Sequence, residues 1–286
     1  MLLVDKPAGP TSHDVVDAVR RALGMRRVGH AGTLDPGATG LLVVLAGRAT
    51  RLARFIAMLP KRYEGTVRFG FETTTDDAAG EPAERDPGWT ARTPSQIEAA
   101  LAHVAAQPLQ LPPPVSAKKV DGERAYRLAR RGEAPVMKPV AVTIHELRLT
   151  GVDPATGEAA IAVACSSGTY VRAIARDLGR ALGTRAHLAA LRRTAIGAWR
   201  VEEAVSLEAL ASGPPPLRPM GEAVAHLPVL EVGAEEGRRF RTGRPLAAPA
   251  VPAGPAGFVA VVEDGQLLGV GECRDEGCVP VVGLAS

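Results

Sequence analysis

Aromatic residues make up only 3% of this chain of 286 residues. Each tyrosine is therefore rare enough to be examined as a candidate site residue: Tyr63, Tyr126 and Tyr170. Cysteine is scarcer still, with three residues and no C-x-x-C pair, so the sequence predicts neither a disulfide framework nor a thiolate zinc site.

Other absences narrow the function further. The six histidines are scattered without an H-E-x-x-H pattern, so we expect no metal. Neither a Gly-Lys-Ser/Thr loop nor a G-x-G-x-x-G pattern is present, and no cofactor is expected. No apolar run is long enough for a membrane span, and the apolar run at residues 1–4 is too short for a signal peptide. We therefore expect a cytoplasmic protein that does not engage a membrane.

Positive charge is clustered along the chain, although the formal net charge is only +3. Between residues 20 and 62, nine Lys/Arg residues stand against the single acid Asp35, and seven arginines between 172 and 200 stand against Asp177. Acids gather instead between residues 72 and 86. This separation indicates a groove for nucleic acid with a solvated far side. The alternative is a surface that follows composition, since arginines outnumber lysines 29 to 5.

The segment from Gly29 to Gly40 is the most informative part of the chain. Its twelve residues, GHAGTLDPGATG, hold four glycines and one carboxylate, Asp35, and lead into the apolar run 41–46. Glycines allow tight turns and close approach to a ligand. A lone acid in a basic field suggests a nucleophile or base that acts on a polyanion. Two other interpretations are a plain Asp-Pro-Gly turn and a phosphate-binding loop.

Hydrophobic periodicity predicts helices and strands in mixed order. Ser12 is the expected N-cap of a helix that ends at Leu23 before Gly24. Further helices are expected over 51–59, 94–106, 125–131 and 171–182, and strands over 2–4, 41–46, 63–71, 140–149 and 160–165. Because these elements lack a regular strand–helix–strand rhythm, the sequence favours an α+β fold with a mixed sheet.

A proline-rich break at 213–219 divides the chain. Residues 1–212 are expected to form one domain that folds alone. Residues 220–286 are expected to form a small β-rich domain, in which Asp264-Gly265 is a hairpin turn between two apolar runs.

Four further segments accompany the Asp35 loop. They are DKPAGPTS (5–12), KRYEG (61–65), PPPVSAKK (112–119) with GERAYRLAR (122–130), and SGTYVRAIARDLG (167–179) with Leu191-Arg-Arg193. In this order and spacing they closely resemble the bacterial tRNA pseudouridine synthases of the TruB type, which isomerise uridine 55 in the T-loop. The resemblance covers nearly the whole chain and implies a pseudouridine synthase domain followed by a reduced PUA-like domain.

The resemblance also implies roles for single residues. Asp35 corresponds to the catalytic aspartate, Arg172 to the arginine that pairs with it, and Tyr63 to the tyrosine that stacks on the target base. Tyr170 and Leu191 correspond to residues beside the aspartate and around the uracil. The remaining implied contacts are to the RNA: His30 enters the T-loop where flipped bases leave a gap, and Lys6 and Arg51 are basic residues on the substrate side.

Two positions depart from the family pattern: Val115 replaces a tyrosine and Ala31 replaces a threonine. The chemistry implied is an isomerisation without redox change, for which one carboxylate suffices. That carboxylate could add covalently or remove a sugar proton to give a glycal, and the sequence leaves both routes open. The expected partner is tRNA, bound by a monomer. The rival hypothesis is an RNA-binding module without catalysis, which would share the basic groove and need no acid at position 35.

Overall fold

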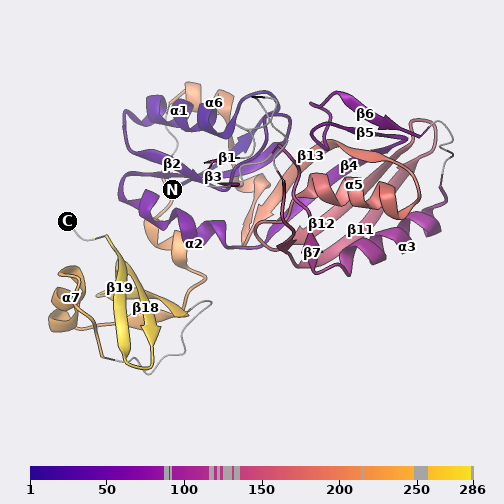
Figure 1. Cartoon of the computed structure of the whole chain (residues 1–286). Helices are drawn as coiled ribbons and strands as arrows, with labels where there is room; N and C mark the ends of the chain where they lie inside the picture. The colour runs from indigo at the N-terminus through magenta and orange to yellow at the C-terminus, as the bar shows by residue number, and fades with distance from the viewer. Residues whose placement is uncertain are drawn as a thin grey trace.

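The computed structural model describes residues 1–86, 90, 92–115, 119–120, 123–124, 131, 136–213, 216–247 and 257–284. A long mixed sheet forms the larger part of the molecule, and a separate four-stranded sheet forms its C-terminal part (Figure 1). The α+β fold predicted from the sequence is confirmed. Within these ranges, no helix combines the length and apolar character that crossing a membrane requires.

The central sheet contains nine strands. They are β1 (Leu2–Lys6), β2 (Val28–Ala31), β3 (Thr39–Ala46), β4 (Lys61–Phe69), β11 (Ile144–Asp153), β12 (Glu158–Cys165), β13 (Ala186–Ile196), β14 (Trp199–Arg200) and β15 (Val205–Ser206). Their order is β11-β12-β4-β13-β3-β1-β15, with β14 beside β13 and β2 beside β3. β13 runs parallel to β3, and β1 runs parallel to β15, whereas the other pairs are antiparallel.

β3 is buried on both faces, which explains its unbroken apolar sequence. On one face, Leu41, Val43 and Leu45 pack in the same core as Phe55 of helix α2 (Ala53–Ala57). On the other, Leu42 and Val44 pack with helix α1 (Ser12–Leu23). The loop that precedes β3 is therefore attached to a strand that is buried on both faces.

Two of the described helices cover a face of the other half of the sheet (Figure 1). Helices α3 (Pro94–Ala105) and α5 (Val171–Ala181) pack against β11, β12, β4 and β13 through Ile97, Leu101, Ile174 and Leu178. Residues of β4 alternate between this core and an exposed face, as the sequence predicted.

Several predicted boundaries need correction. Thr11, not Ser12, is the N-cap of α1, because its hydroxyl accepts from the Asp14 amide while the Asp14 carboxylate accepts from Thr11. The helix expected over 51–59 is a 3₁₀ turn, η1 (Gly47–Leu52), followed by α2. Of the strand expected over 140–149, residues 144–149 lie in β11, whereas Val140 and Ala141 pair with a different strand. The helix expected over 125–131 falls outside the described residues, apart from position 131.

Shorter elements connect the sheet. They are β5 (Phe71–Thr73), β6 (Pro82–Arg85), β7 (Leu109–Gln110), β8 (Lys119–Val120), β9 (Glu123–Arg124), β10 (Val140–Ala141), η2 (Val201–Glu203), α6 (Leu207–Ala211) and η3 (Met220–Val224).

The C-terminal sheet has the order β16-β17-β18-β19 and carries helix α7 (Ala234–Arg241). Its strands are β16 (Val229–Glu231), β17 (Phe258–Glu263), β18 (Gln266–Arg274) and β19 (Gly277–Gly283). The predicted hairpin turn is confirmed: Asp264 and Gly265 connect β17 to β18 with φ of 48° and 74°, the positive values that this two-residue turn requires.

The expectation that cysteine forms no disulfide was wrong for one pair. Cys273 and Cys278 face each other on β18 and β19 and are joined by a disulfide. The odd total leaves Cys165 free and buried. Sequence spacing missed the pair because the two residues are brought together by the register of a hairpin, not by a short motif.

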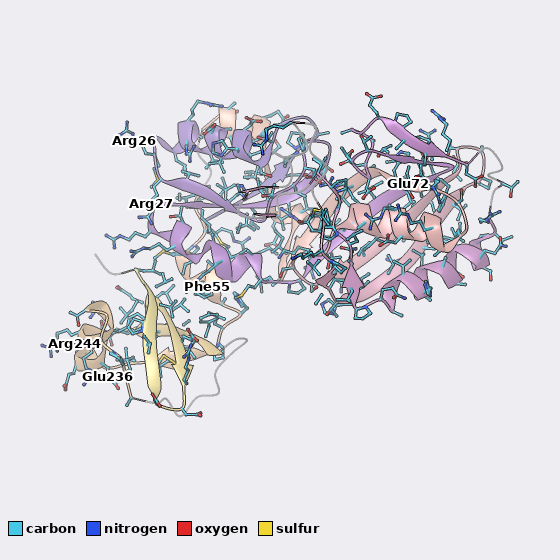
Figure 2. All side chains as sticks on the ribbon, in the orientation of Figure 1. Arg26, Arg27, Phe55, Glu72, Glu236 and Arg244 are labelled. Atoms are coloured by element: carbon cyan, nitrogen blue, oxygen red, sulfur yellow. A yellow bond between two sulfur atoms is a disulfide. The ribbon has the colours of Figure 1, made fainter. Side chains whose placement is uncertain are left out.

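The core crosses the proline-rich break. Phe55 of α2 makes an edge-to-face contact with Phe258 of β17, with ring centroids 5.2 Å apart. The same apolar cluster contains Ala223 and Val224 of η3 and Val270 of β18. Figure 2 labels Phe55 where α2 meets the C-terminal sheet. The C-terminal sheet is thus packed against the larger part of the molecule through an apolar contact.

Candidate active site

Asp35 lies on the loop between β2 and β3. Its Asp-Pro-Gly sequence does form a tight turn, in which the Ala38 amide donates to the Asp35 carbonyl at 3.1 Å. The turn leaves the carboxylate accessible, with 44% of the side chain exposed. The buried Ser12 hydroxyl fixes the loop by bonding the Leu34 amide at 2.9 Å and the Leu34 carbonyl at 3.0 Å. The two interpretations are therefore compatible, because the Asp-Pro-Gly turn is what exposes the Asp35 carboxylate.

Lys6 of β1 holds the Asp35 loop through hydrogen bonds to its backbone. Its side chain is fully buried, and its ammonium donates to the carbonyls of Pro7 (2.8 Å), Pro36 (3.0 Å) and Ala38 (2.7 Å). Burial lowers the pKa of Lys6, and the Asp35 carboxylate opposes that shift. A side chain with no exposure has no surface to offer a phosphate, so the structure assigns Lys6 to holding the loop.

Arg193 is a second buried support, which sequence reasoning counted only as part of a basic cluster. It is 1% exposed and donates to the carbonyls of Leu41 (2.8 Å), Gly32 (3.0 Å) and Thr33 (3.3 Å). Gly40 pairs with Arg193 across the parallel β3–β13 contact and has a φ of 102°. A Cβ at Gly40 would lie 2.2 Å from the Arg193 carbonyl oxygen, so only glycine fits there.

Arg172 is the second residue of α5, whose N-cap is Tyr170, and its side chain approaches Asp35. Its Nε is 3.0 Å from the Asp35 carboxylate. Its Nη1 donates to the Thr75 carbonyl at 2.9 Å and lies 3.5 Å from the Asp77 carboxylate. The Arg172 side chain is only 7% exposed, so its direction is fixed before any ligand arrives. Sequence reasoning predicted the first of these partners and missed Asp77.

The acidic segment 72–86 was predicted to be a solvated far side, which is wrong for its first residues. Glu72 and Asp76 are buried, and they pair with Arg180 and Arg176 of α5 at 2.9 and 2.8 Å. Burial raises the pKa of Asp76, against the effect of Arg176. These pairs fix the segment that presents Asp77 to the site.

Ion pairs of this kind neutralise most of the second basic cluster, residues 172–200. Five of its seven arginines form ion pairs with acids of this chain: Arg172, Arg176, Arg180, Arg185 and Arg192. In the first cluster, Arg21, Arg26 and Arg27 are exposed, and within the described residues none of these three is in an ion pair. Figure 2 shows Arg26 and Arg27 at the edge of the molecule. Of these two clusters, the first therefore presents more unpaired positive charge on its surface, at Arg21, Arg26 and Arg27.

A cavity of about 270 Å³ opens beside Asp35. The candidate residues Tyr63, Tyr170, Arg172 and Leu191 line it together with Asp35, as do Lys61 and Arg193, which the sequence did not single out as site residues. Burial raises the pKa of the Tyr63 hydroxyl, so the phenol stays neutral. The cavity joins residues from four separate stretches of the chain.

Tyr170 is fixed through its backbone. Gln110 of β7 accepts from the Tyr170 amide at 2.8 Å and donates to the Tyr170 carbonyl at 3.1 Å. Leu191 of β13 is held next to β3, because the Thr39 hydroxyl donates to the Leu191 carbonyl at 3.4 Å. Both residues thus have defined positions on the cavity wall.

His30 and Arg51 do not line this cavity. His30 lies on β2, and its buried Nδ1 finds no hydrogen-bond partner among the described residues. Burial and the nearby Arg193 lower the pKa of His30. Arg51 lies on η1 and donates to the Gly283 carbonyl of β19. In this structure Arg51 connects the larger part of the molecule to the C-terminal sheet.

Solved structures with a similar fold are known. One chain, from a structure titled as an H/ACA RNP bound to a substrate RNA containing 2'-deoxyuridine, matches with a TM-score of 0.73, 21% identity, and coverage of 99% of this chain and 83% of that chain. Another, from a Cbf5-Nop10-Gar1 complex, gives a TM-score of 0.71 at 23% identity, covering 96% and 78%. These likenesses show that the chain shares the fold of those two proteins.

Sequence comparisons are more specific. Residues 20–171 match the model described as "TruB family pseudouridylate synthase (N terminal domain)", residues 172–213 match "tRNA pseudouridylate synthase B C-terminal domain", and residues 228–282 match "Pseudouridine synthase II TruB, C-terminal". The tRNA pseudouridine synthase B of Thermobifida fusca is 48% identical over 297 residues, covering 100% of this chain and 98% of that protein. That of Parasynechococcus marenigrum is 44% identical over 272 residues, covering 94% and 91%.

The chain belongs to the TruB family of pseudouridylate synthases, as the resemblance in its motifs predicted. It is therefore an isomerase, and its family implies that it binds RNA and converts uridine to pseudouridine in tRNA.

Proposed function

We propose that this enzyme isomerises uridine 55 in the T-loop of tRNA, with Asp35 as the carboxylate that reacts. The observation that carries the proposal is the position of Asp35 at the cavity, 3.0 Å from the buried Arg172. An RNA-binding module without catalysis would not need a half-exposed carboxylate held by an arginine that is itself fixed by Thr75 and Asp77.

The target base leaves the RNA stack and enters the cavity. A uridine inside a folded loop must be extruded to expose its glycosidic bond, at a cost of about a few kcal/mol. Tyr63 offers an aromatic face on which the base stacks, which offsets part of that cost. Tyr170 and Leu191 complete the walls around the ring. Asp35 then either adds to the substrate or removes a sugar proton, and both routes need its ionised form.

The remaining candidates act outside the cavity. His30 has an unpaired buried nitrogen and is proposed to enter the gap that flipped bases leave in the T-loop. Arg51 stays a proposed substrate-side residue, although its guanidinium bonds the C-terminal sheet. Lys6 is proposed to act on the substrate only through the loop that it holds.

We further propose that residues 1–212 form the catalytic part and that residues 220–286 form a PUA-like RNA-binding part. The tRNA is bound by a cytoplasmic monomer without a cofactor.

The test is turnover on a T-loop hairpin and on full tRNA, read by chemical labelling of pseudouridine. Asp35→Asn is expected to abolish turnover and to leave tRNA binding nearly intact, because size and loop geometry are kept. Asp153→Asn, at an exposed turn far along the chain, is the matched control and should retain parental activity. Activity of Asp35→Asn within roughly tenfold of the parent, about 1.4 kcal/mol of barrier, would remove Asp35 from the mechanism.

A further inference from the structure

Lys61 is a buried cation on the wall of the cavity beside Asp35. It is the first residue of β4 and lies two positions before Tyr63, so both side chains are on the same face of the strand. Only 6% of Lys61 is exposed, and its ammonium donates to the Ala57 carbonyl at the end of α2. An ammonium has three hydrogen-bond donors, so this carbonyl alone does not satisfy it.

Among the described residues, the charged groups that act on Lys61 include no carboxylate. Arg193 of β13 adds positive charge, the Cys165 thiol of β12 lies across the strand pair, and the neutral Tyr63 is on β4 itself. Among the described residues, no carboxylate forms an ion pair with Lys61. Burial and Arg193 lower the pKa of Lys61 to about 8. Burying a cation without an anion is costly, and such a group is expected where a ligand brings negative charge.

We propose that Lys61 donates to a carbonyl oxygen of the flipped uracil and stabilises the negative charge that the ring acquires during the reaction. This inference rests on the proposed function, and it identifies a catalytic group that neither the motif resemblance nor the sequence analysis assigned. Its geometric basis is the shared cavity wall, where Tyr63 offers a stacking face and Lys61 lies next to it on the same strand face.

The chemistry demands such a group on either route. When the bond from uracil N1 to the sugar C1' breaks, its electron pair leaves with the ring and spreads over N1 and the two carbonyl oxygens. After the ring turns, C5 uses that electron pair to form the new bond to C1'. The proton on C5 is then lost, and N1 gains one, so the product is an isomer with no net change. A fixed cation at a carbonyl oxygen lowers the barrier while the ring is anionic.

A purely structural alternative is that Lys61 only caps α2. A lysine at a helix end normally keeps its charge in water, where it interacts weakly with the helix dipole. α2 has only five residues, Ala53–Ala57, and so offers little dipole to justify burying an ammonium. The two interpretations differ in what they predict for the oxygen atoms of the substrate.

The experiment compares the parent, Lys61→Met and Arg62→Met on T-loop hairpins that carry uridine, 2-thiouridine or 4-thiouridine at the target position. Arg62 is the next residue on β4, is exposed, and pairs with Glu146 at 2.8 Å, which makes it the matched control. Lys61→Met should slow single-turnover conversion of uridine by about 100-fold, the usual effect of losing one charge-stabilising donor, with RNA binding unchanged. Arg62→Met should keep the parental single-turnover rate.

The sulfur substitutions report contact directly. Replacing the oxygen that Lys61 contacts should slow the parent about tenfold more than it slows Lys61→Met, and only one of the two thio positions should show this difference. A lower melting temperature alone cannot produce that pattern. If Lys61→Met does not fold, Lys61→Gln keeps a donor for Ala57 without the charge and should show the same rate loss.

Two results overturn the inference: a Lys61 variant within threefold of the parent, or equal thio effects in the parent and the Lys61 variant at both positions. Absence of turnover by the parent on uridine would instead refute the proposed function.

Discussion

Removal of residues 220–286 is expected to destabilise the remaining chain severely, although the sequence alone suggested that residues 1–212 fold without them. Leu52, Phe55 and Ile56 are fully buried, and they belong to the same cluster as Val224 and Val270 of the removed part. Exposing three such side chains costs up to about 5–9 kcal/mol, at about 1.5–3 kcal/mol each. A typical domain has only about 5–15 kcal/mol of stability in total.

The assay is urea unfolding of the full chain and of the 1–219 fragment, monitored by circular dichroism, together with turnover on the T-loop hairpin. The fragment should aggregate or unfold at a much lower urea concentration. Phe258→Ala in the full chain is the graded control, because it removes the edge-to-face partner of Phe55 and leaves the C-terminal sheet in place. It should cost about 2–4 kcal/mol, since the ring is partly buried.

A fragment that unfolds at the same urea concentration as the full chain would refute this reasoning. It would show that the cluster shared across the proline-rich break contributes no stability. Full hairpin activity of such a fragment would support the independent catalytic domain that sequence composition predicts.

Three further outcomes are expected. Tyr63→Leu should reduce turnover far more than Tyr63→Phe, because Phe keeps the stacking face, and equal severe losses would point instead to the hydroxyl. Gly40→Ala should lower stability by at least about 2 kcal/mol in a melting experiment, because the added Cβ meets the Arg193 carbonyl, and an unchanged melting temperature would contradict that contact. Arg26→Ala should reduce the slope of log Kd against log salt by roughly one, whereas the buried Lys6→Met should leave it unchanged; the reverse result would exchange their roles.

Local signals in the sequence were enough to predict many of the elements. Gly24 ends α1 with a φ of 60°, Asp264-Gly265 forms the hairpin turn, and the apolar run after Gly40 is a buried strand, because each depends on neighbouring residues. The Asp35 loop was also identified from its own composition. The resemblance of the motifs to the TruB family then predicted that Arg172 pairs with Asp35, and the two side chains do form an ion pair.

Burial and long-range pairing could not be predicted in the same way. The sequence places Lys6 on the substrate side and Lys61 and Arg193 in basic clusters. The sheet encloses all three, and each donates to backbone carbonyls. Asp77 read as part of an acidic loop because its partner, Arg172, is far away in sequence. The Cys273–Cys278 pair depends on the register of two strands. Hydrophobic periodicity predicts which face of a helix or strand is apolar. It does not predict which residues contact the polar face.

The parallel contact between β3 and β13 has a consequence for synthesis of the protein. Thr39 and Gly40 pair with Arg192 and Arg193, so the Asp35 loop gains its buried arginine only after most of the chain has left the ribosome. Long-range parallel pairing is slow to form, and it follows the closure of a large loop. A ribosome-bound chain that ends before β13 therefore has the Asp35 carboxylate without Arg193 to hold its loop.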